Sequence, residues 1–306
     1  MHCASKSYED RPVSSLRASP SVNESVSGPS ASAVPHDQAE SRPPPLADIS
    51  TFLKTLRLAT ERAGGALETM GEVGGLPLFA WTKRVKPQPC ALAATTPRPR
   101  VYISAGTHGD EAAGPLAVLE LLNEGFFDAR AHWFICPALN PLGLQLGTRE
   151  NAQGIDLNRD YFTRRSEEVR AHTAWLQKQP PFDLTLCLHE DWESTGFYLY
   201  ELNHGARPSL AQVMLDAVRP LMPIEPAQVI DGRPIDEPGI LRPQITAEGR
   251  SDWPEPLYLH EQQHSDRSYT LETPSSLPLA QRVAAQRAIV AAAVDAVLKE
   301  HSAAAG

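Results

Sequence analysis

The chain has 306 residues, 42% of them hydrophobic, which is enough for one large domain or two small ones with a sizeable core. Its formal net charge is −9 and it has no block of Lys and Arg, which argues against a nucleic-acid partner. The sequence has neither the apolar run of a secretory signal nor an apolar window long enough to span a bilayer, so we expect a cytoplasmic protein with no membrane partner.

The first 45 residues are rich in Ser, Pro, Ala and charged side chains, and Pro43, Pro44 and Pro45 close the stretch. They offer too little apolar surface to offset the entropy of ordering. We therefore predict a disordered N-terminal tail over residues 1–45 and one folded domain over residues 46–306.

The folded part begins with an amphipathic pattern that predicts a helix over residues 46–63 and then, across Gly74 and Gly75, a hairpin of residues 66–73 and 76–81. An alternation of apolar runs and helical patterns follows, which predicts an α/β fold with a mostly parallel twisted sheet and helices on both faces. The expected strands are 100–104, 131–136, 183–189, 196–202 and 268–272, and the expected helices are 112–123, 166–179, 208–222 and 278–301. Residues 223–267 are rich in Pro and acids and have little periodicity, as functional or disordered loops do.

The run VYISAGTHGDEAAGP places His108 and Glu111 in a turn directly after a predicted buried strand. A His and a Glu three residues apart can face one centre, and their nitrogen and oxygen atoms suit zinc. Open α/β sheets bind ligands at this end of their strands. The pair is therefore a candidate zinc site, although the spacing alone also arises by chance.

Two more strand ends carry candidate groups. In LTLCLHED, His189 is either a third ligand or a satisfied structural histidine. In SYTLETPSS, Glu272 is either a carboxylate that takes a proton from water at the metal or a capping or solvent-facing acid. Cys187 and Cys136 lie within apolar strand-like runs, and no CxxC pair is present, so we expect both to be reduced core residues.

The segment GTRENAQGIDLNRDYF contains Arg149, Asn158 and Arg159. Their guanidinium and amide donors suit a carboxylate or a developing oxyanion, although charged loop residues are usually only solvated. Together beside a zinc site, they indicate an anionic substrate.

A second zinc-like motif, HEQQH at residues 260–264, needs a helix that places both histidines on one face. Pro254 and Pro256 crowd the start of such a helix, and a strand-like run begins near Ser268. We therefore expect HEQQH to belong to a loop that borders the cleft rather than to bind the metal. His260, Glu261 and His264 then either contact substrate or form a bystander surface, and we favour the bystander surface.

Taken in order, THGDE, Asn140-Pro141, TRENAQGIDLNRDYF, LHED and TLETP resemble the carboxypeptidase A-like zinc metallopeptidases. The likeness is to the compact bacterial branch that contains murein tripeptide amidases and the related succinylglutamate desuccinylase/aspartoacylase group, and it covers roughly residues 64 to 300. It implies a zinc carboxypeptidase-like catalytic domain over residues 46–306.

The resemblance also implies roles for single residues. One zinc ion per chain would be held by His108, Glu111 and His189, with Glu272 as general base and then acid. Arg149 would polarise the scissile carbonyl, and Asn158 and Arg159 would clamp the substrate carboxylate. Tyr258 is the nearest candidate for the tyrosine that covers the substrate in the peptidases, and Tyr198 or Tyr200 could face substrate or simply pack.

These features predict a zinc metallocarboxypeptidase that cleaves an amide bond next to a free carboxylate in a small peptide. The alternative is an N-acyl amino acid hydrolase of the desuccinylase/aspartoacylase type, and a third reading is a non-catalytic zinc-bound recognition module. Glu272 argues against the last, because a binding module needs no base. The sequence fixes neither the side-chain preference nor the oligomeric state.

Overall fold

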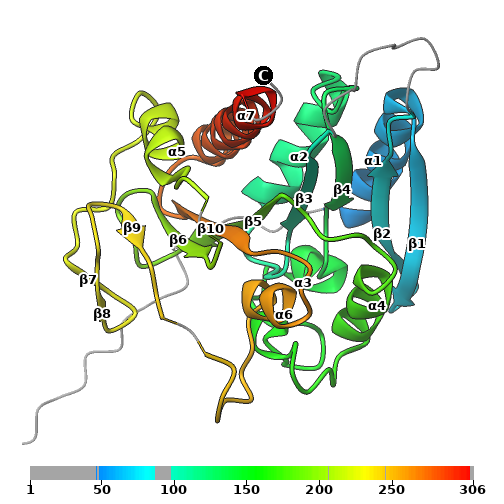
Figure 1. The fold of residues 1–306 in the computed structure, drawn as a ribbon. Coiled ribbons are helices and arrows are strands. Elements are labelled where there is room, and N and C mark those ends of the chain that lie inside the picture. The colour runs from blue at the N-terminus through cyan, green and yellow to red at the C-terminus, as the bar shows by residue number, and fades with distance from the viewer. Residues whose placement is uncertain (1–45, 47, 87–97, 206, 245, 304–306) are drawn as a thin grey trace, which may run out of the picture. The chain divides into compact units, whose positions relative to one another are not determined.

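The fold is built around one eight-stranded sheet with the strand order β1-β2-β4-β3-β5-β10-β6-β9 (Figure 1). The structure is a computed structural model that describes residues 46, 48–86, 98–205, 207–244 and 246–303, so the predicted tail lies outside the described residues. None of the helices within those ranges is long and apolar enough to cross a membrane.

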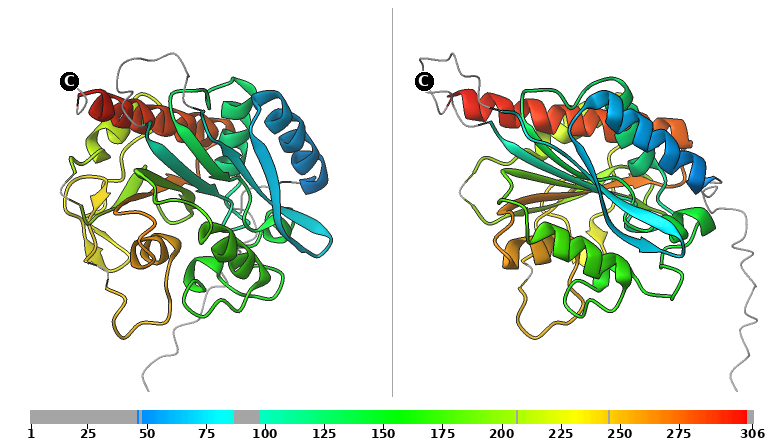
Figure 2. Two further views of the ribbon diagram at one scale, coloured as in Figure 1. Left: turned by 45° about the vertical axis from the view of Figure 1, so that its right-hand side comes forward. Right: turned by 90° about the vertical axis from the view of Figure 1, so that its right-hand side faces the viewer.

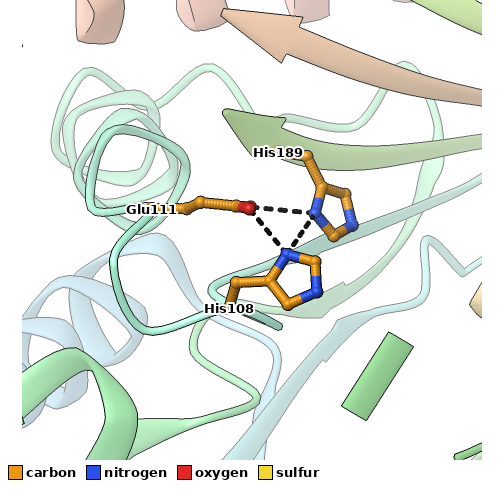
Figure 3. Close-up of side chains that lie close together, drawn as sticks. All are labelled: His108, Glu111 and His189. Carbon is orange, nitrogen blue, oxygen red and sulfur yellow. Dashed lines mark hydrogen bonds and ion pairs between the residues drawn. The ribbon is translucent and has the colours of Figure 1, made fainter. Parts of the chain in front are cut away.

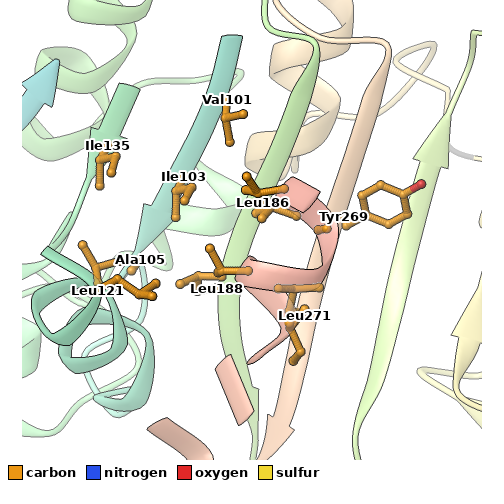
Figure 4. Packing of buried hydrophobic residues seen from close by; sticks show 14 of the residues in the cluster. Val101, Ile103, Ala105, Leu121, Ile135, Leu186, Leu188, Tyr269 and Leu271 are labelled. Atoms are coloured by element: carbon orange, nitrogen blue, oxygen red, sulfur yellow. The ribbon is translucent and has the colours of Figure 1, made fainter. Parts of the chain in front are cut away.

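The centre of the sheet is parallel and buried on both faces. It consists of β4 (His132–Cys136), β3 (Arg100–Ala105), β5 (Leu184–Asp191) and β10 (Arg267–Pro274). Apolar residues fill both faces because successive side chains of a strand point to opposite sides. Val101 and Ile103 face one core with Leu186 and Leu271 (Figure 4), while Tyr102 faces the other.

Antiparallel strand pairs join each edge of the sheet to its centre. At one edge, β1 (Ala66–Val73) and β2 (Leu76–Lys83) form a hairpin whose turn is Gly74-Gly75. Both glycines have positive φ, 57° and 79°, which suits the tight hairpin turn and disfavours other residues there. At the other edge, β6 (Tyr198–Asn203) pairs with β10 and with the short β9 (Ile240–Leu241), and β7 (Val229–Ile230) with β8 (Arg233–Pro234) forms a separate hairpin.

Helices cover both faces of the sheet (Figure 2). One face packs against α1 (Ile49–Ala63), α2 (Ala113–Asn123), α5 (Ala211–Val218) and α7 (Leu279–Ala303). The other face packs against α4 (Glu167–Leu176) and α6 (Glu255–Glu261). The predicted fold class, a mixed and mostly parallel α/β sheet with helices on both faces, is confirmed.

Two short helices depart from the sequence prediction. Helix α3 (Pro141–Leu146) begins at the Asn140 cap, and α6 contains the first two residues of HEQQH. We expected Pro254 and Pro256 to leave little room for a helix that carries both HEQQH histidines; a helix does form, but it ends at Glu261, before His264. Pro254 is the N-cap and Pro256 lies in the first turn, where proline is tolerated because that N–H has no partner within the helix.

Candidate metal centre and cleft

The loop after β3 brings His108 and Glu111 to the carboxyl end of the sheet. Its backbone packs directly on α3: a Cβ at Gly109 would lie 1.9 Å from the carbonyl carbon of Gly143. Only glycine permits this approach. The N–H of Gly109 also donates to the carbonyl of Thr148 at 2.9 Å, which fixes the turn that carries both side chains.

His108, Glu111 and His189 meet in one buried cluster, with 2%, 3% and 2% of their surfaces exposed (Figure 3). The Glu111 carboxylate lies 2.6 Å from Nδ1 of His108 and 2.8 Å from Nδ1 of His189, and the two nitrogens are 3.3 Å apart. Among the described residues this is the one group of three or more His, Cys, Asp or Glu side chains whose candidate ligand atoms all lie within 4.8 Å.

The electrostatics of this cluster favour a cation. Burial opposes charge on both groups, but the two imidazoles lower the pKa of Glu111, and Glu111 and Asp156 raise the pKa of His108 to about 9. Nε2 of His189 is buried and has no hydrogen-bond partner among the described residues. Two imidazole nitrogens and one carboxylate therefore fit a divalent metal ion.

Asp156 is a further residue of the site that the sequence did not single out. Its carboxylate lies 3.1 Å from Nε2 of His108 and 3.1 Å from Nη2 of Arg149. A hydrogen bond from Nε2–H to Asp156 leaves Nδ1 of His108 free to bind the metal. In the sequence, Asp156 stands out only as an acid two residues before Asn158. Its position in a loop does not reveal that its hydrogen-bond partner is His108, 48 residues earlier.

Glu272 reaches the site because β10 lies between β5 and β6. The register places Glu272 beside His189 on one side and beside Tyr198 on the other. Burial, and then repulsion by Glu111 and Asp191, raise the pKa of the Glu272 carboxyl well above its usual range, against the attraction of His189 and Arg149. A carboxyl group in such surroundings takes up a proton readily.

A cavity of about 300 Å³ opens over the cluster. The predicted site residues that line it are His108, Glu111, Arg149, Asn158, Arg159 and Glu272. Oδ1 of Asn158 accepts a hydrogen bond from the backbone N–H of Glu255 at 2.9 Å, whereas Arg159 is exposed. The cavity therefore combines a cation site, a carboxylate and three side chains that can donate hydrogen bonds to an anion.

The structure corrects the prediction for Tyr258. Its side chain is buried in the core beneath the sheet, with its ring centroid 5.6 Å from that of Tyr161, and it does not line the cavity. Tyr198 and Tyr200 line the cavity instead, and their hydroxyls donate to Asp191 and Asp231.

The HEQQH histidines lie away from the cavity. Helix α6 ends at Glu261, and Gln263 has a φ of 57°, so His260 and His264 do not share a helix face. The His260 ring stacks on His204 at 3.8 Å, and the His264 ring stacks on Phe182 at 6.1 Å. None of residues 260–264 lines the cavity, which argues against substrate contact and leaves the favoured alternative, a bystander surface.

Comparisons with known proteins find metal-dependent hydrolases among the proteins that this chain resembles. Residues 97–224 match the succinylglutamate desuccinylase/aspartoacylase catalytic domain. The chain is 34% identical over 84 residues to murein peptide amidase A of Escherichia coli and 29% identical over 126 residues to carboxypeptidase SOL1 of Arabidopsis thaliana. These matches cover 28% and 34% of this chain but only 34% and 25% of the two relatives.

Solved structures resemble the chain over a larger part of its length. A candidate metallopeptidase of Shewanella amazonensis is 27% identical, with a TM-score of 0.68 over 82% of this chain and 93% of that one. A metallo-carboxypeptidase of Burkholderia cenocepacia, 20% identical, has a TM-score of 0.56 over 82% and 68% and shares the fold. The resemblance read from the sequence is confirmed, and the metallopeptidase relatives imply a metal at the His108 cluster.

Proposed function

We propose that the protein is a zinc-dependent amidohydrolase of the metallocarboxypeptidase type, which cleaves an amide bond next to a free carboxylate. The observation that carries the proposal is the cavity itself. His108 and Glu111, which cluster with His189, line it together with the Glu272 carboxylate and the side chains of Arg149, Asn158 and Arg159. They come from four separate parts of the chain, so their meeting is a property of the fold.

In this proposal Nδ1 of His108, Nδ1 of His189 and the Glu111 carboxylate hold the zinc ion. Zinc, when bound, supplies a Lewis acid that polarises the scissile carbonyl and makes water more acidic. Glu272 accepts a proton from the attacking water and passes it to the leaving amine as the C–N bond breaks. Because its pKa is raised by burial, Glu272 holds this proton more readily than an exposed glutamate would.

The remaining side chains would bind the substrate. Arg149 donates to the oxyanion that develops on the carbonyl oxygen, and its ion pair with Asp156 restrains the guanidinium group. The amide of Asn158 and the guanidinium of Arg159 would bind the free carboxylate.

An N-acyl amino acid hydrolase is the second candidate, and the match of residues 97–224 to the desuccinylase/aspartoacylase domain favours it. That match includes the three proposed zinc ligands, Arg149, Asn158 and Arg159, and it ends before Glu272. Both candidates use the same bond chemistry. They differ in whether the acyl side is a peptide or a small acid.

The test combines metal analysis with one substitution. We expect about one zinc per chain, and we expect Glu272→Gln to keep the metal while losing roughly 10³-fold in kcat/KM. The exposed Glu68→Gln on β1 is the matched control. Normal turnover by Glu272→Gln would contradict the mechanism, and zinc binding without turnover in the unmodified protein would indicate a recognition module. Parallel assays on peptides and N-acyl amino acids distinguish the two substrate classes.

A further inference from the structure

Glu255, at the start of α6, is a buried carboxylate outside the proposed reaction. Its side chain is fully buried and accepts hydrogen bonds from Tyr102 Oη at 2.6 Å and Ser104 Oγ at 2.9 Å, both on β3. Within the described residues no Lys, Arg or His forms an ion pair with it. A buried carboxyl group without a cation is costly, so neutral donors at both oxygens satisfy it in place of an ion pair.

The hydrogen bonds around Glu255 have one consistent direction. Tyr102 uses its single proton on Glu255, so its oxygen accepts from Nε2–H of His172 at 2.8 Å, and Nδ1 of His172 accepts from Tyr161 Oη at 2.8 Å. A neutral imidazole supplies one donor and one acceptor, as this chain requires. The network therefore fixes the start of α6 to the middle of the sheet.

The backbone of Glu255 connects this network to the cavity. Its N–H donates to Oδ1 of Asn158 at 2.9 Å, and both groups are buried. Because an N–H can pair only with the oxygen of the Asn158 amide, the contact fixes which way that amide is turned. Oδ1 faces Glu255, which leaves the Nδ2 donor group for the cavity that Asn158 lines.

Further contacts hold the same two segments together. The N–H of Tyr161 donates to the carbonyl of Trp253 at 3.3 Å, and the ring centroids of Phe162 and Trp253 are 5.0 Å apart. The segment that carries Asn158 and Arg159 is thus supported by residues nearly a hundred positions later in the chain.

We propose that Glu255 is a positioning residue for carboxylate recognition: its side chain anchors α6, and its N–H holds the Asn158 amide with the donor group toward the substrate. This inference rests on the proposed function, which requires a free carboxylate in the cavity. An amide turned the other way would present an oxygen to that carboxylate and repel it. The inference therefore concerns binding of the carboxylate and does not involve the bond-breaking step.

The test measures the binding of 3-phenylpropanoate, which has no scissile amide bond, and of its carboxamide by calorimetry in the zinc-loaded protein. We expect the wild-type protein to favour the acid, and Glu255→Leu to reduce this preference roughly tenfold, because one oriented hydrogen bond to the carboxylate is lost. Glu255→Gln should restore most of it, since Gln can accept from Tyr102 and donate to Ser104. Glu261→Leu, an exposed position on the same helix, is the matched control.

Tyr102→Phe is a second, milder variant that removes one of the two donors to Glu255 without changing α6, and it should reduce the preference by a smaller factor. If Glu255→Leu does not fold, Tyr102→Phe decides the question. Weaker binding of acid and carboxamide to the same extent would indicate a structural role only and overturn the inference. A wild-type protein that binds both equally would contradict the proposed function as well, which distinguishes the two failures.

Discussion

Two pairs of histidines in this chain look alike in sequence and differ in their surroundings. His108 follows strand β3 and His189 lies near the end of β5, whereas His260 and His264 belong to HEQQH around the end of α6. The first pair meets a shared carboxylate, Glu111, in a buried cluster. The second pair is separated by the end of the helix, and each ring stacks on another ring.

The difference shows that a metal motif depends on the element that carries it. Neighbouring parallel strands bring residues 81 positions apart to one edge of the sheet. A helix must continue for a full turn past its first histidine to bring the second onto the same face, and α6 ends one residue after His260.

Replacing histidines of the two pairs by alanine should have the most different effects on zinc binding. His108→Ala or His189→Ala removes one of three proposed ligands, so we expect the variant to lose zinc at equimolar metal. Because catalysis depends on the metal, we expect activity to fall by roughly 10³-fold or more. A His260→Ala/His264→Ala double variant should keep one zinc per chain. Metal content, measured on the folded protein, decides between the pairs: loss of zinc in the double variant alone would reverse the assignment.

A buried ion pair supports the segments that carry His108, Glu111 and His189. Glu190, next to His189, is buried against Arg282 of α7 and accepts from the N–H of Ala113, two residues after Glu111. This arrangement ties together the two segments that carry proposed ligands. Among the described residues, no buried ion pair lies next to the HEQQH histidines.

We expect Arg282→Ala to lower the free energy of unfolding by about 3 to 5 kcal/mol, because it leaves Glu190 buried without its partner. Arg287→Ala, on the same helix but paired with Glu120 and Glu124 at the surface, should cost about 1 kcal/mol or less. Urea denaturation of the metal-free variants gives both values. Equal losses would show that the buried pair has no special role.

Asp156 holds His108 from the side opposite the metal site, and among the described residues the HEQQH histidines have no comparable carboxylate partner within hydrogen-bond distance. Asp156→Asn keeps the size of the side chain but weakens its acceptor strength toward Nε2–H of His108 and removes its charge beside Arg149. We expect zinc affinity or kcat/KM to fall about 10- to 100-fold. Asp252→Asn, an exposed acid that pairs with Arg250, is the control, and an equal loss there would argue against a role in orienting His108.

Much of the fold follows from local patterns in the sequence. Five of the strands after the hairpin, β3, β4, β5, β6 and β10, were predicted to within about two residues at each end, because buried strands have continuous apolar runs. The two-residue strands β7, β8 and β9 are too short to leave such a pattern. Helix α6 was missed, since it has only seven residues, too few to show a helical period, and prolines stand at its start. Asp156 was missed, and Tyr258 was assigned to the cavity although it lies in the core. Both errors arise because the partners of a side chain depend on packing between segments far apart in sequence.

His172 differs from His108 in its surroundings, because it is buried between two hydroxyls instead of among carboxylates. Burial lowers its pKa to about 3, whereas carboxylates raise that of His108 to about 9. Because the folded pKa lies below the unfolded value of about 6.5, the unfolded chain binds the extra proton. Stability from this group is therefore complete above about pH 6.5 and is lost as the pH falls toward 3.

The loss is at most about 1.4 kcal/mol per pH unit, or roughly 2 kcal/mol at pH 5. His172→Gln can donate to Tyr102 and accept from Tyr161 without titrating, so its unfolding free energy should change less between pH 7.5 and pH 5 than that of the wild type. His301→Gln, at the end of α7, is the control. The same acid sensitivity in His172→Gln as in the wild type would show that this histidine is not kept neutral by its surroundings, because only a histidine held neutral in the folded state produces the difference.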